Sequence, residues 1–329
     1  MQKRRFGKTG WMVTEVGLGT WNIGADWGDV SDEEGYAAIR ASLDAGINLL
    51  DTADVYGDGR SEQHIAKILE EYRDEERIYV ITKTGRRASP HVTDEYNAKN
   101  LEAWIDRSRA YLNVETLDLV QLHCPPHDVY YNPDVFAALE RFVEQGKIAH
   151  YGVSVEKIEQ AMMAMEYPNM VSVQIIFNMF RLRPIERFFD AAKQNDIAVI
   201  ARVPLASGLL TGKITADTTF PEDDHRNYNR QGAAFDVGET FSGVPFEQGL
   251  RAVDALREVV PAGMTMAQFA LRWILMFDAV STVIPGSTKP QHIADNVAAA
   301  GMPALTHAEM GAVHDIYDRY IRDSVHTRW

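Results

Sequence analysis

The segment Ile78-Tyr79-Val80-Ile81-Thr82-Lys83 is a short apolar run that ends in polar residues, and it sets the pattern for the whole chain. The same pattern recurs at residues 16–19, 48–51, 117–123, 150–154, 171–176, 197–201 and 281–285. Short apolar runs bounded by turn residues suit buried parallel strands, and helical stretches fill the gaps between them. Eight strands that alternate with helices predict an α/β fold of the closed (β/α)8 TIM barrel type, with an open doubly wound sheet as the alternative.

Residues that favour helix ends place several of these helices. Ser31 and Glu34 have the spacing of a capping box, and Gly46 is a suitable stop for the helix that they begin. Pro184 suits the first turn of another helix, because proline is favoured there. Thr265 can cap the apolar segment 266–277. These signals predict helices after the first strand, after the sixth strand and before the eighth.

Two segments fall outside the strand–helix repeat. Residues 4–14 have the pattern of a β-hairpin that precedes the first strand, where it would close the bottom of the barrel. The gap after the seventh strand is longer than one helix needs, and its middle, residues 220–245, is rich in Gly, Asp, Asn and Arg. We interpret it as a long loop that folds over a ligand, the alternative being a floppy surface insertion.

The composition is that of an acidic globular chain. Of its 329 residues, 46% are hydrophobic and 24% are charged, and 33 Lys and Arg oppose 47 Asp and Glu, for a net charge of −14. A (β/α)8 barrel commonly has about 250 residues or more, so we expect residues 1–329 to form a single barrel domain. A negative surface repels phosphate backbones, which argues against a nucleic-acid partner.

Cysteine usage and hydropathy bear on the compartment. Cys124 is the single cysteine, so neither an intrachain disulfide nor a thiolate-rich metal site can form. The positively charged N-terminal residues are not followed by the apolar region of a signal peptide. No run of about 18 apolar residues, the length that spans a bilayer, occurs in the sequence. We therefore expect a cytoplasmic protein with no membrane partner.

Four side chains with complementary chemistry stand at or just after the ends of three successive strands: Asp51, Tyr56, Lys83 and His123. In a barrel, these strand ends converge on one mouth. A Lys ammonium lowers the pKa of a nearby Tyr hydroxyl towards the range of efficient proton transfer, and Asp51 can balance the charge of a buried Lys83. A His at the same mouth can hydrogen-bond a carbonyl oxygen. The set suits carbonyl reduction or alcohol oxidation, and it requires a cofactor that supplies the hydride.

The residues around this set resemble those of the aldo-keto reductases. The resemblance is carried by Asp51-Thr52-Ala53-Asp54-Val55-Tyr56-Gly57, by the strand that ends in Lys83 and by Gln121-Leu122-His123, and it extends from residues 17–21 to residues 284–287. It implies a (β/α)8 barrel that binds NADP(H), usually in preference to NAD(H), without a Rossmann domain. It also implies that Asp51, Tyr56, Lys83 and His123 form the catalytic tetrad, with Tyr56 as general acid or base.

The resemblance also suggests how the cofactor is held. Ser154 and Gln174 match positions that bind the nicotinamide carboxamide, although Val155 stands where the family often has Asn. Arg202 replaces the aromatic residue that usually stacks on the nicotinamide ring, and a guanidinium plane can also stack. Residues 204–213 resemble the loop that clasps the pyrophosphate. The contacts expected from this loop are Pro204, Leu205, Ser207, Gly208, Leu210 and Lys213.

Further predicted contacts lie at the two ends of the barrel sequence. Thr20, Trp21 and Asp51 are expected to contact the cofactor, and Trp21 lines the substrate pocket with Tyr56 and His123. Residues 285–296 resemble the adenosine-phosphate site, in which a 2′-phosphate needs cations and donors. The contacts expected there are Gly286, Ser287, Thr288, Lys289 and His292, with Asp295 and Asn296 at the adenine. His292 stands where many members have Arg, so NAD(H) stays possible beside the favoured NADP(H), and Arg226 or Arg230 could compensate.

Three functional hypotheses follow from these observations. The first is an oxidoreductase that reduces small aldehydes or ketones, or oxidises the matching alcohols, sugars or polyols. The second is a cofactor-binding regulatory subunit that resembles potassium-channel β-subunits, a branch that tends to have Asn at the position of His123. The third is a metal-dependent barrel hydrolase, which is disfavoured because no set of metal ligands accompanies His123, and no metal site is expected. The oligomeric state stays open between a monomer and a small homo-oligomer.

Overall fold

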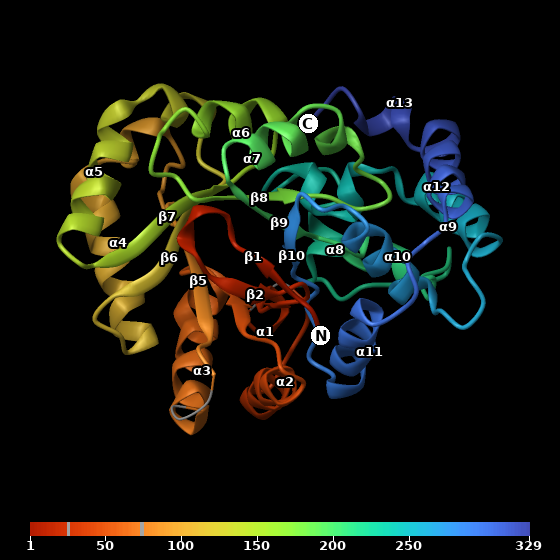
Figure 1. Ribbon diagram of the computed structural model, residues 1–329, viewed down its shortest axis with the longest axis horizontal. Coiled ribbons are helices and arrows are strands. Elements are labelled where there is room, and N and C mark those ends of the chain that lie inside the picture. Colours follow the sequence, from red (N-terminus) through yellow and green to blue (C-terminus); the bar gives the residue numbers. More distant parts are fainter. Residues whose placement is uncertain (25–26, 73–75) are drawn as a thin grey trace.

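The computed structural model describes residues 1–24, 27–72 and 76–329, and Figure 1 shows a sheet surrounded by helices. The eight strands of this sheet are parallel and follow the chain, in the order β10-β9-β8-β7-β6-β5-β4-β3. Their bounds are β3 Leu18–Gly19, β4 Leu49–Asp51, β5 Tyr79–Thr84, β6 Leu117–His123, β7 Ile148–Ser154, β8 Ser172–Ile176, β9 Ala198–Arg202 and β10 Val280–Val283. Every predicted run overlaps one strand, so the predicted α/β class is confirmed.

The first and last strands meet and close the sheet into a barrel. Parallel bridges pair Val16 with Val283 and Gly19 with Gly286. The Gly17 amide donates to the Val283 carbonyl at 2.8 Å, and the Val283 amide donates to the Glu15 carbonyl at 3.0 Å. Because the strands run in sequential order and close, the predicted (β/α)8 barrel is confirmed and the open doubly wound sheet is wrong.

The strands alternate with helices that pack on the outside of the barrel. These are α2 Asp32–Asp44, α3 Arg60–Leu69, α4 Ala98–Leu112, α5 Pro133–Glu144, α6 Ile158–Ala164, α7 Phe188–Gln194, α10 Met266–Leu275 and α11 Pro290–Ala300. The additional helices are α1 Trp21–Gly24, α8 His225–Tyr228, α9 Phe246–Arg257, α12 His307–Tyr320 and α13 Arg322–Val325. Of the helices in the described part of the chain, none has the length and apolar character needed to cross a membrane.

The helix-end signals at Ser31 and Glu34, at Gly46 and at Thr265 are confirmed, with Gly46 in the left-handed region at φ 82° just after α2, whereas Pro184 begins only a short 3-10 helix. The Ser31 hydroxyl accepts from the Glu34 amide in a complete capping box at the start of α2. Thr265 caps α10 in the same way, with Gln268 as its partner. Pro184 does not start an α-helix, because it lies in a 3-10 turn and the backbone at Arg187, with φ −143°, leaves the helical region before α7 begins.

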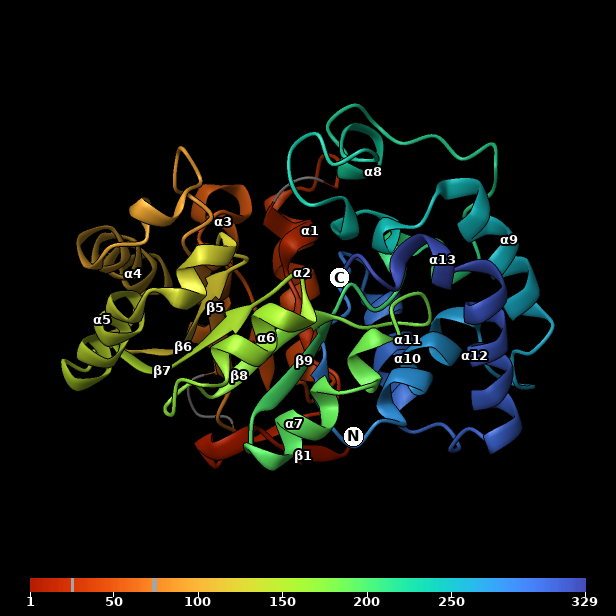
Figure 2. The ribbon, with the colours of Figure 1, turned by 90° about the horizontal axis from the view of Figure 1, so that it is seen from above.

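The predicted hairpin closes the N-terminal end of the barrel. Its strands, β1 Lys3–Arg5 and β2 Met12–Thr14, pair antiparallel. Phe6 from the turn and Val13 from β2 pack in one buried cluster with Leu49, Ile81 and Leu119 from the barrel strands. Figure 2 shows the hairpin at the bottom of the view and α8 at the top, so the two lie at opposite ends of the barrel. Access to the interior is therefore left to the C-terminal mouth.

The long loop after β9 is packed onto this mouth. It contains α8 and two 3-10 turns, Val237–Glu239 and Phe241–Gly243. Asn229 and Thr240 are buried, and the Asn229 amide donates to the Thr240 hydroxyl at 3.2 Å. The interpretation as a floppy insertion is therefore wrong, whereas the role of the loop over a ligand stays a prediction.

Candidate active site

The four predicted catalytic side chains meet at the mouth of the barrel. Asp51 ends β4, Lys83 is the last residue but one of β5, and His123 ends β6. The Lys83 ammonium lies 2.7 Å from Asp51 Oδ2 and 3.4 Å from the Tyr56 hydroxyl. The rings of Tyr56 and His123 meet edge to face, with their centroids 5.9 Å apart. The four residues, which are spread over 73 positions of the sequence from Asp51 to His123, therefore form one compact group.

A tight turn and a close helix contact position Tyr56. The turn that follows it, Tyr56–Gly59, has positive φ values of 60° at Gly57 and 55° at Asp58, in the region that favours glycine. Helix α1 lies against the Tyr56 backbone, because a Cβ at Gly24 would come within 2.6 Å of it. The Tyr56 backbone is therefore held from both sides.

The ion pair under Tyr56 is buried and supported by hydrogen bonds. Burial lowers the pKa of Lys83 and raises the pKa of Asp51, and the attraction between the two charges opposes both shifts. The Lys83 ammonium also donates to the Thr52 carbonyl at 2.8 Å, and the Gln174 amide donates to Asp51 Oδ1 at 2.7 Å. These bonds satisfy the polar atoms that a buried pair would otherwise leave without partners.

The pKa of Tyr56 moves in the direction opposite to our expectation. Burial raises it well above its ordinary value, and the carboxylates of Asp51 and Glu239 raise it further. The expected lowering by Lys83 is wrong for this arrangement, because the ammonium lies closer to Asp51 than to the phenol. Tyr56 thus keeps its proton at neutral pH and can act as a proton donor.

His123 is neutral at neutral pH. Burial lowers its pKa well below the ordinary value, and the nearby positive charges of Arg86 and Lys83 lower it further. Arg86 Nη1 lies 3.5 Å from His123 Nε2. A neutral imidazole can donate one hydrogen bond, which is the capacity needed to orient a carbonyl group.

The two residues expected at the carboxamide lie side by side. Ser154 and Gln174 are register partners on β7 and β8. The Gln174 amide, which donates to Asp51, also donates to Gln121 Oε1 at 3.1 Å. The sequence did not indicate these hydrogen bonds of Gln174. The bond to Asp51 connects the expected carboxamide site with the Lys83–Asp51 pair.

Arg202 ends β9 between two buried carboxylates. Its Nη2 lies 3.2 Å from Glu156 Oε2 and 3.0 Å from the Val155 carbonyl, and its Nη1 donates to Glu239. The pKa values of the two acids move apart: burial and the Glu239 charge raise that of Glu156 to about 7. Although burial opposes it, the charges of Arg202 and Arg86 lower the pKa of Glu239 to about 2. The pair therefore carries less than two full negative charges at neutral pH.

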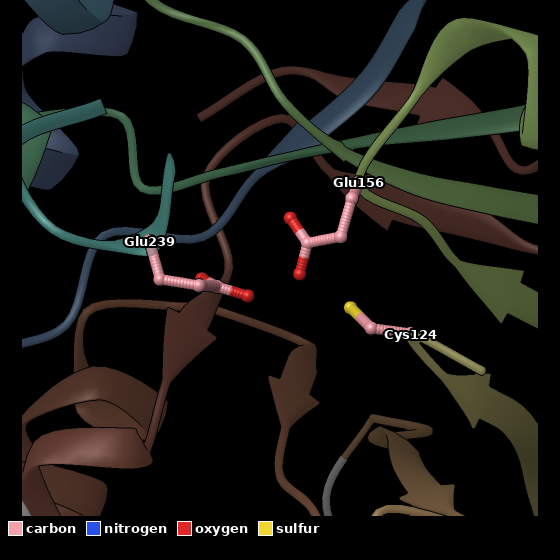
Figure 3. A group of neighbouring side chains, drawn as sticks. All are labelled: Cys124, Glu156 and Glu239. Atoms are coloured by element: carbon pink, nitrogen blue, oxygen red, sulfur yellow. The ribbon is translucent and has the colours of Figure 1, made fainter. Parts of the chain in front are cut away.

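The same two acids lie close to the Cys124 thiol, in a group with the residue types of a metal site. Ligand atoms of Cys124, Glu156 and Glu239 lie within 4.8 Å of one another, and Figure 3 shows the Cys124 thiol and the Glu156 carboxylate pointing toward the same space. Arg202 already supplies the positive charge there. Burial raises the pKa of the Cys124 thiol, so it is protonated rather than the thiolate that binds metals. Nothing in this group calls for a metal ion.

Aromatic side chains cover the mouth above Tyr56. Trp21 stacks on Tyr56 with the ring centroids 6.3 Å apart, and it approaches His225 at 4.7 Å and Phe235 at 5.9 Å. His225 and Phe235 belong to the long loop. The structure thus places Trp21 beside the tetrad, as the predicted substrate role requires, and adds loop residues that the sequence did not identify.

Trp329 anchors the long loop from outside. Its side chain is buried, and its Nε1 donates to Asp236 Oδ1 at 2.8 Å. The ring fits against Gly243, where a Cβ would come within 2.3 Å of it. The Arg181 guanidinium lies over the ring at 4.1 Å. The segment that carries Glu239 is therefore held on both of its sides.

Three further predicted cofactor residues, like Gln174 and Arg202, use their side chains within the protein. The Thr20 hydroxyl donates to the Asp51 carbonyl at 2.8 Å. The Ser207 hydroxyl donates to the Glu239 carbonyl at 3.2 Å and accepts from the Phe241 amide at 3.0 Å. Leu210 packs in the hydrophobic core. These side chains support the walls of the site.

A positively charged corner forms where α11 begins. Lys289 is the N-cap of α11, and its amide donates to the Ser287 hydroxyl at 3.1 Å. Burial lowers the pKa of His292, and the nearby charges of Lys213 and Lys289 lower it further. Asn296 is buried on the same helix, and the Asp295 carbonyl accepts from Gln268 at 3.4 Å. The other predicted contacts follow the two strands: Pro204, Leu205 and Gly208 after β9, and Gly286 and Thr288 after β10.

Of the two loop arginines considered as compensating cations, Arg226 lies beside the predicted pyrophosphate loop, where a Cβ at Gly208 would be 3.7 Å from its Nη1. Arg226 pairs with Asp224 at 2.5 Å and lies over the Phe220 ring at 4.5 Å. Arg230 lies over the Phe246 ring at 4.8 Å. Lys213 and Lys289 both lower the pKa of His292, so two lysines contribute positive charge near the start of α11.

A sequence model of the aldo/keto reductase family matches residues 15–318. The chain belongs to the aldo/keto reductase family. It is 30% identical over 294 residues to the aldo-keto reductase YhdN of Bacillus subtilis. This alignment covers 88% of this chain and 86% of the relative. It is 27% identical over 298 residues to the fission yeast aldo-keto reductase yakc, whose name includes NADP(+), with 87% and 84% covered.

The fold comparison agrees with this assignment. The glycerol dehydrogenase of Gluconobacter oxydans superposes with a TM-score of 0.78 at 30% identity, covering 97% of this chain and 96% of that one. A probable potassium-channel β-subunit of Arabidopsis thaliana is also related, at 26% identity over 331 residues, with 96% of each chain covered. The predicted resemblance is thus confirmed, and the prediction of an oxidoreductase holds at the level of the family.

Proposed function

We propose that this protein is an NADP(H)-dependent cytoplasmic oxidoreductase that reduces small aldehydes or ketones, or oxidises the matching alcohols, sugars or polyols. The proposal is carried by one observation. A protonated Tyr56, a neutral His123 and the buried Lys83–Asp51 pair converge at the open end of a barrel whose other end is closed. Carbonyl reduction needs a proton donor and a hydrogen-bond donor on the same oxygen, and this arrangement supplies both.

Each residue of the tetrad has a distinct task in this reaction. A nicotinamide cofactor, when bound, would supply the hydride for carbonyl reduction or accept it in alcohol oxidation. Tyr56 donates its proton to the developing alkoxide, and His123 hydrogen-bonds the same oxygen and sets its orientation. Lys83, 3.4 Å from the Tyr56 hydroxyl, stabilises the tyrosinate that remains. Asp51 holds Lys83 in its charged form.

The cofactor proposal rests on the corner at α11 and on the strands beside the tetrad. Lys213, Lys289 and His292 gather at the N-terminus of an 11-residue helix, where backbone amides and positive charge favour a phosphate group. Ser154 and Gln174 lie next to the tetrad, at the other end of the proposed site. The fission yeast relative with NADP(+) in its name supports the phosphorylated cofactor. Arg202 would contact the nicotinamide ring.

A titration followed by a single substitution tests this proposal. Trp21 lies at the mouth, so NADPH should quench tryptophan fluorescence at lower concentrations than NADH. With NADPH and a panel of small aldehydes, Tyr56→Phe should lose about 10²- to 10⁴-fold in kcat, because general acid catalysis contributes that much. NADPH affinity should stay within about twofold of the wild type. Full activity of the variant, or a folded protein that binds neither nucleotide, would refute the proposal.

The regulatory alternative is supported by the channel β-subunit among the relatives. That hypothesis predicts NADPH binding with negligible turnover on every aldehyde tested. His123, in place of the Asn that we associate with that branch, favours the enzyme. Turnover measured beside the titration separates the two.

A further inference from the structure

One cation at the active-site mouth is largely without acceptors. Arg86 follows β5 by two residues, and its side chain is 23% exposed. Within the described residues, Arg86 reaches two polar partners: His123 Nε2 at 3.5 Å and Glu239 Oε1 at 3.6 Å. Both contacts are longer than an ordinary hydrogen bond to a guanidinium. Most of its five N–H donors remain available to a ligand.

The neighbouring Arg202 differs in this respect. Its two terminal nitrogens meet Glu239, Glu156 and the Val155 carbonyl, with the measured distances at 3.0 to 3.2 Å. Glu239 is shared between the two guanidinium groups, and Glu156 carries only part of a charge near neutral pH. Two full positive charges therefore face fewer than two negative ones, which leaves the mouth able to accept an anion.

The contact between Arg86 and His123 leaves one imidazole nitrogen without a partner among the described residues. A guanidinium only donates, so the pair can bond only if His123 Nε2 accepts. The hydrogen of the neutral imidazole then lies on Nδ1, which is buried and has no partner among the described residues. A substrate that offers one oxygen to Arg86 and another to His123 would let both groups donate, with Nε2 carrying the hydrogen.

We propose that Arg86 is the specificity-determining residue of this site and binds a carboxylate carried by the substrate close to its reacting carbonyl. The inference rests on the proposed function, because it takes the carbonyl oxygen to lie at Tyr56 and His123. If the two hydrogen bonds, each about 2.9 Å long, run roughly parallel from nitrogens 3.5 Å apart, they meet acceptor oxygens about 3.5 Å apart. That spacing matches 2-oxo to 4-oxo acids, in which one to three carbon–carbon bonds separate the carbonyl and carboxylate carbons.

The first test uses the wild-type protein and two pairs of compounds. Pyruvate and 4-oxobutanoate are compared with their methyl esters, which keep the reacting carbonyl and lose the charge. We expect kcat/KM with NADPH to favour each reactive acid over its ester by at least about tenfold, the lower range for a charged hydrogen bond. Turnover of the esters without preference for either acid would refute the role of Arg86 and leave the proposed function intact. Turnover of neither acids, esters nor simple aldehydes would refute both.

The second test changes the residue. Arg86→Gln should lower kcat/KM for the acids about 10- to 100-fold and leave kcat/KM for the esters within about threefold of the wild-type value. The assay is run at pH 8, where His123 is neutral in both proteins. Arg86→Lys, which keeps the charge and loses the bidentate geometry, should fall between. Arg77→Gln is the matched control, because Arg77 is 63% exposed and precedes β5, at the opposite end from the site. An Arg86→Gln protein that binds NADPH normally and keeps the acid preference would overturn the inference.

Discussion

The buried ion pair beneath Tyr56 allows a stability prediction whose size follows from the structure. Lys83 and Asp51 are 2.7 Å apart and almost inaccessible to solvent. Lys83→Met would leave the Asp51 carboxylate buried with Gln174 as its remaining side-chain partner. Asp51 would then take up a proton on folding. Because its ordinary pKa is about 3.9, this uptake costs about 1.4 kcal/mol for each pH unit above that value, or about 4 kcal/mol at pH 7.

The pH dependence gives the sign of the effect. A carboxyl group whose folded pKa is raised destabilises the fold above its unfolded pKa, so the penalty of Lys83→Met should shrink as the pH falls. It should be about 4 kcal/mol at pH 7 and about 1.5 kcal/mol at pH 5. Urea unfolding, followed by tryptophan fluorescence at pH 5, 6 and 7, measures this difference directly.

Two further variants isolate the charge. In Lys83→Met combined with Asp51→Asn neither residue of this pair carries a charge, so the penalty should be nearly constant from pH 5 to pH 7. Lys147→Met removes a more exposed lysine that is paired with Glu102 and Asp106, and it should cost less than about 1 kcal/mol. A penalty of Lys83→Met that does not change with pH would show that Asp51 is not the group responsible.

Two more predictions concern titratable side chains at the mouth. The pKa of His123 is lowered in the fold, so below about pH 6.5 the unfolded chain binds a proton at His123 that the folded chain does not bind. The free energy of unfolding should therefore decrease as the pH is lowered below 6.5. His123→Gln should remove up to about 1.4 kcal/mol per pH unit of this slope in urea unfolding, and an unchanged slope would contradict the assignment. Burial raises the pKa of the Cys124 thiol, so the native protein should not react with Ellman's reagent at pH 8, whereas one thiol per chain should react in guanidinium chloride. Rapid reaction of the native thiol would show that Cys124 is accessible.

The barrel could be predicted because its signals are local. Each strand is a short apolar run, so the predicted and observed strands overlap throughout, and β6 has the predicted bounds of 117–123. Asp51, Lys83 and His123 stand at the ends of predicted strands, and Tyr56 follows Asp51 by five positions. Pro184 begins the 3-10 helix Arg183–Ile185, but α7 begins only after Arg187, where the backbone leaves the helical region, and no local signal shows that.

The electrostatics of the site could not be predicted in the same way. Glu239 and its partner Arg202 are 37 positions apart, and nothing in the loop sequence marks that contact. The pKa of Tyr56 depends on burial and on this same carboxylate, so its direction was predicted wrongly. The position of Arg86 at the mouth could have been predicted from the sequence, because it follows Lys83 by three positions at the same strand end. Its available donors become visible only when its neighbours are known.

The closure of the barrel has a consequence for how the molecule holds together. Between β3 and β10 the sheet is joined by backbone bonds such as those from Gly17 to Val283 and from Gly19 to Pro285, the latter at 3.2 Å. The proposed cofactor residues flank this join, with Trp21 on one side and Ser287 on the other. A molecule bound across this join would contact both the first and the last strand of the barrel. Its binding free energy would add to the free energy of unfolding of the chain. In a cell, the supply of such a molecule would then set the lifetime of the protein as well as the rate of its reaction.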